Sequence, residues 1–475
     1  MELREVPLTF SREKRSRPRY VLLYAILNLL ALAFARQVFA GEITLETIIR
    51  PTPTPTRTAR SWVEEARAHF EAGNLQEAIE AYRAALALEP TNGRLWAELT
   101  RTLVYSSALL TNDAARHERL KEAVEAANQA VNYAPNDSMA HAMRAFALDW
   151  LATNPLTSPD QREALLAQAE TTAAQARLLD PTNGYALAYY AEILLDQQNF
   201  VQAYEEARNA VEQAPELMDT HRVYATVLEA NGRYLSAIQE YKEAIRRAPN
   251  LTFLYLRVGF NYRHLAGKAQ SKAARQEYYE LARTYFAQAI RINERLGVVD
   301  PVPYIAISKT YVQEGEFFAA ALNAEKALIL DPADPLTYAQ LGVIYIKSRN
   351  YEGSIPVLQC AVEGCGPEVS GQILNEIRGK FNLEPVDNPP EVEPLPLTNT
   401  TVAYYYLQYA SVLAALNVCD RALPILAQVE ALYGSDPVIA NIVAENRNIC
   451  RLLQQRSTPQ PTPRATGTPT PTPAR

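Results

Sequence analysis

Two successive segments of equal length decide the fold: GYALAYYAEILLDQQNFVQAYEEARNAVEQAPEL (residues 184–217) and MDTHRVYATVLEANGRYLSAIQEYKEAIRRAPNL (residues 218–251). Pro181, Pro215 and Pro249 lie 34 residues apart (215 − 181 and 249 − 215), and the same residue types recur between them. A fixed period of this size is typical of stacked helical hairpins. The chain is therefore expected to be built from repeated helix pairs.

The second segment explains why each unit should be two helices. His221, Tyr224, Ala225 and Leu228 recur at the spacing of one helical face. Asn231-Gly232 then interrupts the pattern, because glycine adopts the left-handed backbone that often ends a helix. A second apolar stripe follows and stops before Pro249, since a proline disfavours a helical residue in front of it. One such hairpin cannot bury both of its faces, so neighbouring units must stack.

The pattern resembles the tetratricopeptide repeat, with a large residue, a small one four positions on, Gly near the turn, alanines in the second helix and a closing proline. Other units fit the same register, and their residues are Trp62, Ala66, Gly73, Ala78, Tyr82, Ala85 and Pro90; Tyr304, Tyr311, Gly315, Ala320, Ala327 and Pro332; and Tyr338, Gly342, Tyr345, Ile355 and Ala361. The resemblance covers about residues 59 to 455. It implies an all-α fold, a right-handed superhelical solenoid of antiparallel helix pairs.

The composition and the breaks in the repeat predict seven regions. They are a basic cytoplasmic tail (1–19), a transmembrane or signal helix (20–41), a Pro/Thr linker (42–58), about eight repeats with insertions in units 2, 3 and 6 (59–366), an irregular Pro-rich insertion (367–400) with one short helix near 371–383, a final repeat with a capping helix (401–455), and a disordered Thr/Pro tail (456–475). The insertions of units 2 and 3 should fall near 106–116 and 152–160, between the two helices.

The segment around Val21–Ala35 is uncharged and mostly apolar, and it follows a basic stretch. Extended from Tyr20 to about Ala40 it approaches the ~20 residues needed to span a bilayer. A signal peptide is the alternative, with cleavage before Gly41. Both interpretations keep the basic flank in the cytoplasm and export the remainder of the chain.

All four cysteines, Cys360, Cys365, Cys419 and Cys450, lie in the last quarter of the chain. An even count in an exported chain suggests disulfides. In the repeat register Cys419 begins a second helix and Cys450 lies late in the helix packed against it, so we expect these two to pair. Cys360 and Cys365 can pair if Gly364 turns the chain between them. Zinc is the rival interpretation, but no C-x-x-C spacing is present.

Enzymatic function is not expected. The sequence contains no P-loop, no G-x-S-x-G and no Gly-rich dinucleotide motif, and the repeats leave no stretch long enough for a catalytic domain. The five histidines are scattered among units, so we expect no metal and no cofactor. The net charge of −7 also argues against nucleic acid as the partner.

The remaining candidate site is the inner surface that the first helices form in this family. Family resemblance places these residues there: Tyr185, Tyr189, Glu192, Asp196, Arg222, Glu229, Phe253, Arg257, Arg263 and Lys309. Aromatic and Arg side chains are common interface anchors. A solvated face with scattered aromatic residues is the alternative. The Lys/Asn clamp of chaperone-binding members is absent, because its slots hold Val63, Arg67 and Glu98.

These observations predict a non-enzymatic, membrane-anchored scaffold outside the cytoplasm that binds a protein or peptide, with no small-molecule substrate. Two alternatives remain open: a secreted soluble adaptor after signal cleavage, and a structural component of the cell envelope with glycosylated Thr/Pro tails. The sequence does not name the partner.

Overall fold

The computed structural model describes residues 18–40, 57–110 and 112–457 of the 475-residue chain. The chain divides into two units, residues 1–58 and residues 59–475, which are described separately. In the first unit, helix α1 (Pro18–Phe39) is long and apolar enough to cross a membrane, and none of its residues is buried. The N-terminal basic tail, the 41–56 part of the Pro/Thr linker and the tail from residue 458 lie outside the described residues.

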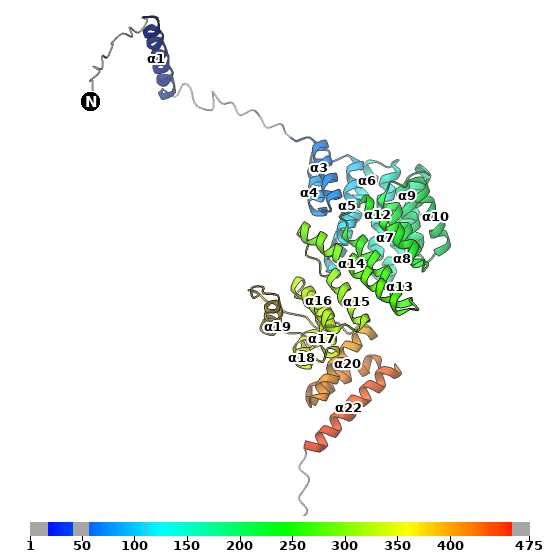
Figure 1. Ribbon diagram of the computed structural model, residues 1–475. Coiled ribbons are helices and arrows are strands. Elements are labelled where there is room, and N and C mark those ends of the chain that lie inside the picture. The colour runs from blue at the N-terminus through cyan, green and yellow to red at the C-terminus, as the bar shows by residue number, and fades with distance from the viewer. Residues whose placement is uncertain (1–17, 41–56, 111, 458–475) are drawn as a thin grey trace, which may run out of the picture. The chain divides into compact units, whose positions relative to one another are not determined.

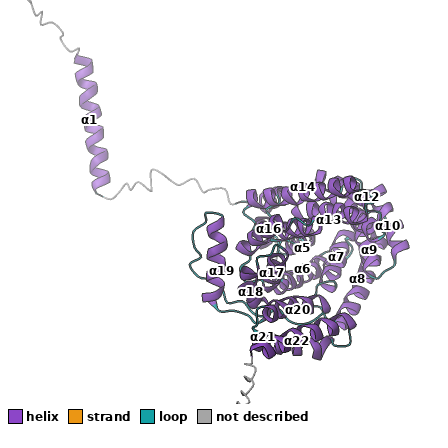
Figure 2. Cartoon of the chain, turned by 60° about the horizontal axis from the view of Figure 1, so that its bottom comes forward, coloured by secondary structure: helices purple, strands orange, loops and turns teal. Residues whose placement is uncertain are grey.

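The second unit is a stack of antiparallel helix pairs (Figures 1 and 2). The eight pairs in residues 59–362 are α3 (Ala59–Ala72) with α4 (Leu75–Leu88), α5 (Gly93–Ser107) with α6 (Asp113–Tyr133), α7 (Ser138–Ala152) with α8 (Pro159–Leu179), α9 (Gly184–Asp196) with α10 (Phe200–Gln213), α11 (Met218–Ala230) with α12 (Tyr234–Arg247), α13 (Thr252–Lys268) with α14 (Lys272–Leu296), α15 (Val302–Glu314) with α16 (Phe317–Leu330), and α17 (Pro335–Lys347) with α18 (Tyr351–Val362). The predicted all-α solenoid is confirmed.

Caps and turns recur from one pair to the next. Asn183 accepts a hydrogen bond from the Tyr185 amide (3.0 Å) at the start of α9, and Asp334 caps α17 in the same way. Such caps satisfy amides that have no partner within the helix. Gly73 and Gly315 make the turns within their pairs at φ +84°, a left-handed conformation that favours glycine.

The insertions of units 2, 3 and 6 are mostly longer second helices. Helices α6 and α8 have 21 residues and α14 has 25, whereas α4, α10 and α12 have 14. In units 2 and 3 the extra length is therefore about two helical turns, and short loops join α5 to α6 and α7 to α8.

The segment after α18 departs from the repeat. Helix α19 (Pro367–Lys380) begins four residues earlier than expected and contacts α16 and α18, and a loop then leads to α20 (Thr400–Ala415). Helices α21 (Cys419–Tyr433) and α22 (Pro437–Ser457) complete the stack, with α20 packed against α18 on one side and α22 on the other. The sulfur atoms of Cys360 and Cys365 are 2.03 Å apart, and those of Cys419 and Cys450 are 2.12 Å apart.

The first six pairs curve until their two ends meet. The Asn250 side-chain amide donates to the Glu71 backbone carbonyl (3.0 Å), although 179 residues separate the two. Leu296 and Asn250 also lie against Gly73. One continuous core joins Val63 to Ile307, and a second core joins Ala320 to Cys450. The inner surface of the first six pairs is thus enclosed by contacts between distant repeats.

Candidate functional site

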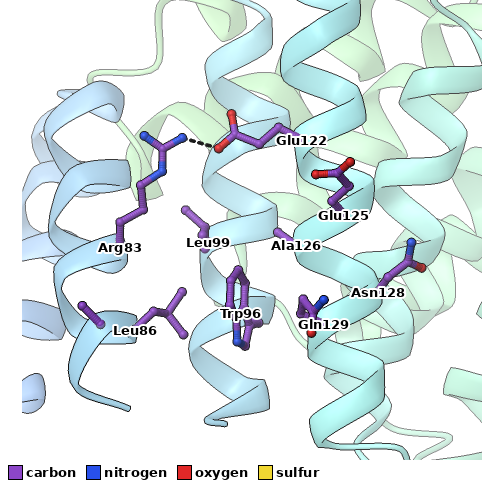
Figure 3. Close-up of a pocket in the computed structure, with 10 residues that line it drawn as sticks. Arg83, Leu86, Trp96, Leu99, Glu122, Glu125, Ala126, Asn128 and Gln129 are labelled. Carbon is purple, nitrogen blue, oxygen red and sulfur yellow. Dashed lines mark hydrogen bonds and ion pairs between the residues drawn. The ribbon is translucent and has the colours of Figure 1, made fainter. Parts of the chain in front are cut away.

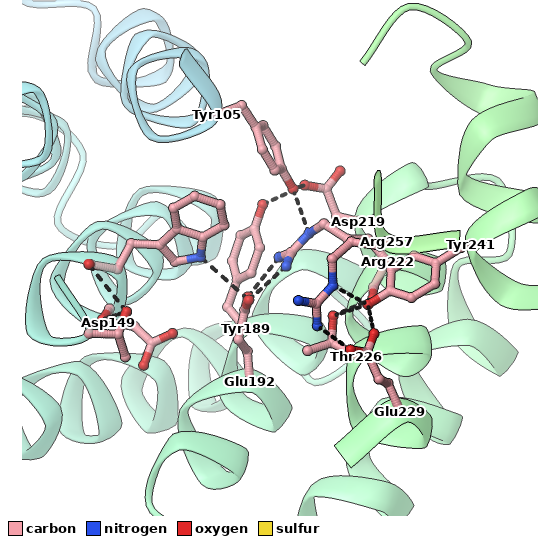
Figure 4. Close-up of polar contacts among 12 residues, drawn as sticks. Tyr105, Asp149, Tyr189, Glu192, Asp219, Arg222, Thr226, Glu229, Tyr241 and Arg257 are labelled. Carbon is pink, nitrogen blue, oxygen red and sulfur yellow. Dashed lines mark hydrogen bonds and ion pairs between the residues drawn. The ribbon is translucent and has the colours of Figure 1, made fainter. Parts of the chain in front are cut away.

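The inner surface of the first six pairs carries a network of charged and aromatic side chains, shown in Figure 4. The first helices α5, α7, α9, α11 and α13 contribute most of these residues. Because the pairs curve around this surface, side chains more than 100 positions apart come into contact. The network therefore links repeats that are not neighbours in the stack.

Asp219 of α11 lies at the centre and is fully buried. Its carboxylate accepts two hydrogen bonds from Arg101 of α5 (3.1 and 2.6 Å), one from Tyr189 (2.7 Å) and one from Tyr105. Burial alone would raise the pKa of Asp219, but the Arg101 charge and these hydrogen bonds outweigh it and the pKa is lowered. Asp219 is thus held ionised between two helices that are 118 residues apart in sequence.

A second buried ion pair lies beside it. Both terminal nitrogens of Arg222 donate to Glu192 (2.6 Å each), and the Arg222 Nε donates to the Tyr105 hydroxyl (3.1 Å). The side chains of Arg222 and Glu192 are only 4% and 9% exposed. Such a bidentate pair is geometrically specific. It leaves neither group free for an external ligand.

A cavity of about 280 Å³ opens next to this pair. It is lined by Ala108, Trp150, Glu192, Arg222, Thr226, Tyr241, Phe253 and Arg257. Arg257 is more accessible than Arg222, with 39% of its side chain exposed, and it pairs with Glu229 (3.0 Å). Phe253 stacks on Tyr105 with ring centroids 5.5 Å apart. The cavity therefore has aromatic walls and two arginines, each paired with a carboxylate.

Arg263 and Lys309 are the two basic inward candidates that have no ion pair with another described residue within 4.0 Å. Arg263 lies over the Phe260 ring (5.1 Å) and donates to the Ala306 carbonyl (3.4 Å). Desolvation of the Lys309 ammonium by neighbouring side chains and the charge of Arg263 lower the pKa of Lys309. The Asp334 carboxylate partly offsets this repulsion from beyond ion-pair distance, so the two neighbouring cations are only weakly compensated. They are suited to an anionic group supplied by a partner.

The structure separates the predicted inner-surface residues into two sets. Tyr189, Glu192 and Arg222 are buried in the network, and Tyr185 is half-buried near Arg101. Phe253, Arg257 and Arg263 are half-buried, and Lys309 is exposed. The buried residues hold the scaffold together, whereas the second set is accessible to a partner.

Tyr105, Asp219 and Tyr241 belong to the network, but the sequence prediction did not include them. The repeat spacing offered a signal for Asp219, which lies 34 residues after Tyr185 and 34 before Phe253 (219 − 185 and 253 − 219). It therefore occupies the same inward slot as these two candidates. No local signal identifies Tyr105, because its contacts depend on the closure between distant repeats.

A cluster of acidic groups lies at the edge of the network. Asp149 is buried, and one of its carboxylate oxygens has no hydrogen-bond partner within the described chain. Desolvation and the negative charge of Glu192 raise the pKa of Asp196 to about 7. Desolvation, followed by the charges of Asp196 and Glu192, raises the pKa of Asp149. A shared proton between Asp149 and Asp196 would relieve the repulsion.

A separate groove of about 600 Å³ lies among α4, α5 and α6 (Figure 3). Leu86, Trp96, Leu99 and Ala126 form its apolar surface, and an ion pair between Arg83 and Glu122 lies at one end. It combines apolar and polar surface and lacks a pair of groups arranged for acid–base or nucleophilic catalysis. Within the described residues there is no group of three His, Cys, Asp or Glu side chains that could hold a metal ion.

Comparison with known families and structures agrees with this architecture. Residues 59–92 match the model of the tetratricopeptide repeat. No curated protein matches the sequence.

Among solved structures, a monomeric mutant of IFIT1 with Gppp-AAAA has a TM-score of 0.50 at 15% identity, covering 86% of this chain and 84% of that one. A human IFIT1 dimer with m7Gppp-AAAA has a TM-score of 0.49 at 14% identity, covering 90% and 88%. A thermophilic TPR protein of Thermus thermophilus has a TM-score of 0.36 at 15% identity, covering 43% and 98%. At these identities the likeness concerns the fold alone.

Proposed function

We propose that this chain, a tetratricopeptide-repeat protein, is a membrane-anchored scaffold that binds a protein or peptide outside the cytoplasm and catalyses no reaction. The observation that carries the proposal is helix α1. It spans 22 residues with a mean hydropathy of 1.8 over its best window, and none of that window is buried in the fold. An apolar helix of this length is long enough to span the hydrocarbon core of a bilayer.

The charges around α1 support the orientation. Arg4, Arg12, Lys14, Arg15 and Arg17 precede the helix in sequence, whereas Arg36 is the one basic residue in its last turn. Basic residues are retained on the cytoplasmic side. The repeats would then lie on the opposite side of the membrane.

The cysteines support the same location. The four cysteines form two close pairs and none is left over. Disulfides persist in oxidising compartments and are rare in the cytosol. We infer that both pairs are disulfides in the exported protein, and that the Cys419–Cys450 bond ties α22 to the rest of the stack.

The partner-binding surface is assigned to Phe253, Arg257, Arg263 and Lys309. The first two line the cavity, and the last two form no ion pair within 4.0 Å with a described carboxylate. An aromatic anchor beside cations fits a peptide that carries an apolar side chain and an acidic group. Nucleic acid is disfavoured as the ligand, because Arg101, Arg222 and Arg257 are each paired with a carboxylate.

Anchoring can be tested by extracting cell membranes with alkaline carbonate and measuring the intact mass of the extracted chain. A full-length chain that stays in the membrane pellet supports the proposal. A soluble chain that begins at Gly41 would instead support the secreted adaptor. Release by wall-degrading enzymes rather than detergent, with added mass on the Thr/Pro peptides, would support the envelope component.

Partner binding can be tested by affinity capture from native membranes, after crosslinking, with the anchored full-length chain. The variants Arg263→Glu and Lys309→Glu should reduce recovery of a specific partner about tenfold, since each puts a like charge opposite the acidic group. Arg208→Glu on α10 is the matched charge reversal outside the inner surface. Equal recovery with all three variants would refute this binding surface.

A further inference from the structure

A second apolar groove lies between the last two repeats. It has a volume of about 310 Å³ and is lined by Ile346, Tyr351, Gln408, Ser411, Val412, Ala415 and Leu416. These residues come from the end of α17, the start of α18 and the last turns of α20. The groove therefore lies at the edge of the stack where each first helix turns into the second.

The groove is unusual in its polarity. No charged side chain lines it, and two large apolar side chains at its surface are half exposed: Tyr351 (48%) and Leu416 (50%). Two hydrogen-bond donors, the Tyr351 hydroxyl and the Gln408 amide, make no hydrogen bond to another described residue. An occupant should therefore be uncharged and apolar, and should offer hydrogen-bond acceptors.

The chain leaves the described structure at the same edge. Cys450 of α22 lies beside Cys419, with their Cα atoms 5.6 Å apart, and Cys419 follows Leu416 by three residues. Helix α22 packs directly on α20 and continues to Ser457, about 10 Å beyond Cys450. Figure 2 shows α20, α21 and α22 grouped together. The three residues from Cys419 back to Leu416 add at most about 11 Å, so the end of α22 lies within roughly 27 Å of Leu416 in the groove.

We propose that the Thr/Pro segment, residues 458–475, folds back and occupies this groove as an extended polyproline II strand. Six of its 18 residues are proline (Pro459, Pro461, Pro463, Pro469, Pro471 and Pro473), and its charged side chains are Arg464 and Arg475. In polyproline II conformation 18 residues reach about 56 Å, more than the return path requires.

The chemistry of the groove matches this occupant. A polyproline II strand makes no internal hydrogen bonds, so its carbonyls are free to accept. Tyr351 and Gln408 supply donors, while proline rings pack on Tyr351 and Leu416 as they do in aromatic-lined recognition grooves. The segment is also tethered close by, so its effective concentration is in the millimolar range and a weak contact suffices.

Photocrosslinking in the full-length protein tests the proposal directly. Tyr351 is replaced by the photoreactive amino acid p-benzoylphenylalanine, the anchored protein is irradiated, and the crosslinked peptides are identified by mass spectrometry. We expect crosslinks to residues 458–475 of the same chain. Crosslinks to a second copy, measured by mixing isotopically heavy and light chains, or to another protein alone would overturn the intramolecular assignment.

A binding measurement tests the same contact independently. A labelled peptide of residues 458–475 should bind the anchored chain truncated after Ser457 at least tenfold more tightly than the full-length chain, whose groove is occupied. Leu416→Asp in the truncated chain should weaken binding at least tenfold, because it places a charge in the apolar groove. Leu322→Asp on α16, which is exposed to a similar extent (48%), is the matched control. Equal binding to the truncated and full-length chains would overturn the proposal.

Discussion

The residue at a single inward-facing position of the repeat, Asp219, determines whether the inner surface is open to a ligand or occupied by side chains of the protein itself. In the neighbouring units the same slot holds Tyr185 and Phe253, which contact other side chains mainly through their rings. A carboxylate there attracts Arg101 from a distant repeat and collects the hydroxyls of Tyr105 and Tyr189. The resulting network fills space that an open solenoid would offer to a ligand.

Removing the Asp219 carboxylate should therefore destabilise the protein strongly. Asp219→Ala leaves the Arg101 side chain, 12% exposed, without its partner, and loss of one member of a buried ion pair costs about 3–5 kcal/mol. Urea unfolding of the full-length protein in detergent, followed by circular dichroism, measures the change. Glu205→Ala removes an exposed ion pair with Arg208 and should change the stability by less than about 1 kcal/mol. Equal effects of the two substitutions would contradict the role assigned to Asp219.

The acidic cluster and Asp219 should affect the pH dependence of stability in opposite directions. The lowered pKa of Asp219 makes the folded state less stable as the pH falls, whereas the raised pKa of Asp196 makes it less stable as the pH rises. The pKa of Asp196 is raised to about 7 in the folded state from an ordinary value of 3.8. Between these values the folded state binds more protons than the unfolded state, so stability falls as the pH rises. Asp196 is desolvated and faces Glu192, both of which raise its pKa, whereas Arg162, the hydrogen bond with Asp149 and Arg222 lower it.

Asp196→Asn should reduce this dependence, since the amide does not titrate. The free energy of unfolding of the variant minus that of the parent should therefore be larger at pH 8 than at pH 5. Urea unfolding of both proteins at both pH values measures this difference. Asp149 still titrates in the variant, so part of the slope should remain. An unchanged difference between the two proteins across this range would exclude the raised pKa of Asp196.

At the scale of the helices, the sequence was sufficient to predict the repeats. The 34-residue period, the glycine at the turn and the closing proline are local signals. The period holds from α9 to α13, and glycine makes the turn at Gly73, Gly232 and Gly315, whereas the other pairs form helical hairpins without a glycine at the turn. Helices α6 and α8 are each about two turns longer than α4, which accounts for the longer spacing between the prolines of these units. The start of α19 at Pro367 was missed, because proline was interpreted as the end of a unit although it also suits the first turn of a helix.

The two helices of a pair approach closely at Gly342, so replacing this glycine by alanine should destabilise the protein, whereas the same replacement at Gly379 should not. A Cβ atom at Gly342 of α17 would lie 2.4 Å from Leu358 Cγ of α18, whereas nothing lies within 4 Å of one at Gly379 of α19. Gly342→Ala should therefore cost about 1–3 kcal/mol by overpacking. Gly379→Ala should be neutral or stabilise by up to about 1 kcal/mol, because alanine favours the helix. Thermal unfolding of both variants measures the difference, and a stabilising Gly342→Ala would contradict the packing described between α17 and α18.

At the scale of the repeat unit, residues 59–475, closure of the first six pairs could not be predicted from the sequence. Curvature accumulates from small rotations between successive units, and no residue pattern in one unit specifies the total. The sequence therefore placed Tyr189, Glu192 and Arg222 on a surface for a partner, and the structure buries them between distant repeats. Local periodicity determines which side chains point inward. Contacts between distant repeats determine which of them remain accessible.

If the first six pairs close on themselves, a substitution at Gly73 should affect distant repeats, which would not happen in an open solenoid. Gly73 and Gly232 both have a left-handed backbone (φ +84° and +73°), so replacement by alanine should cost about 1 kcal/mol of backbone strain at either position. Only at Gly73 would the new Cβ atom meet a distant repeat, at 2.7 Å from the Asn250 carbonyl oxygen and 3.0 Å from Leu296.

Hydrogen exchange of the full-length protein should distinguish the two variants. Gly73→Ala is expected to increase amide exchange both near residue 73 and in residues 250–252 and 295–299, about 180–225 positions away. Gly232→Ala, with nothing within 4 Å of its added carbon, should change exchange only in its own pair and the adjacent ones. In a solenoid stabilised by nearest neighbours alone, both effects would stay local. A local response to Gly73→Ala would therefore contradict closure of the first six pairs.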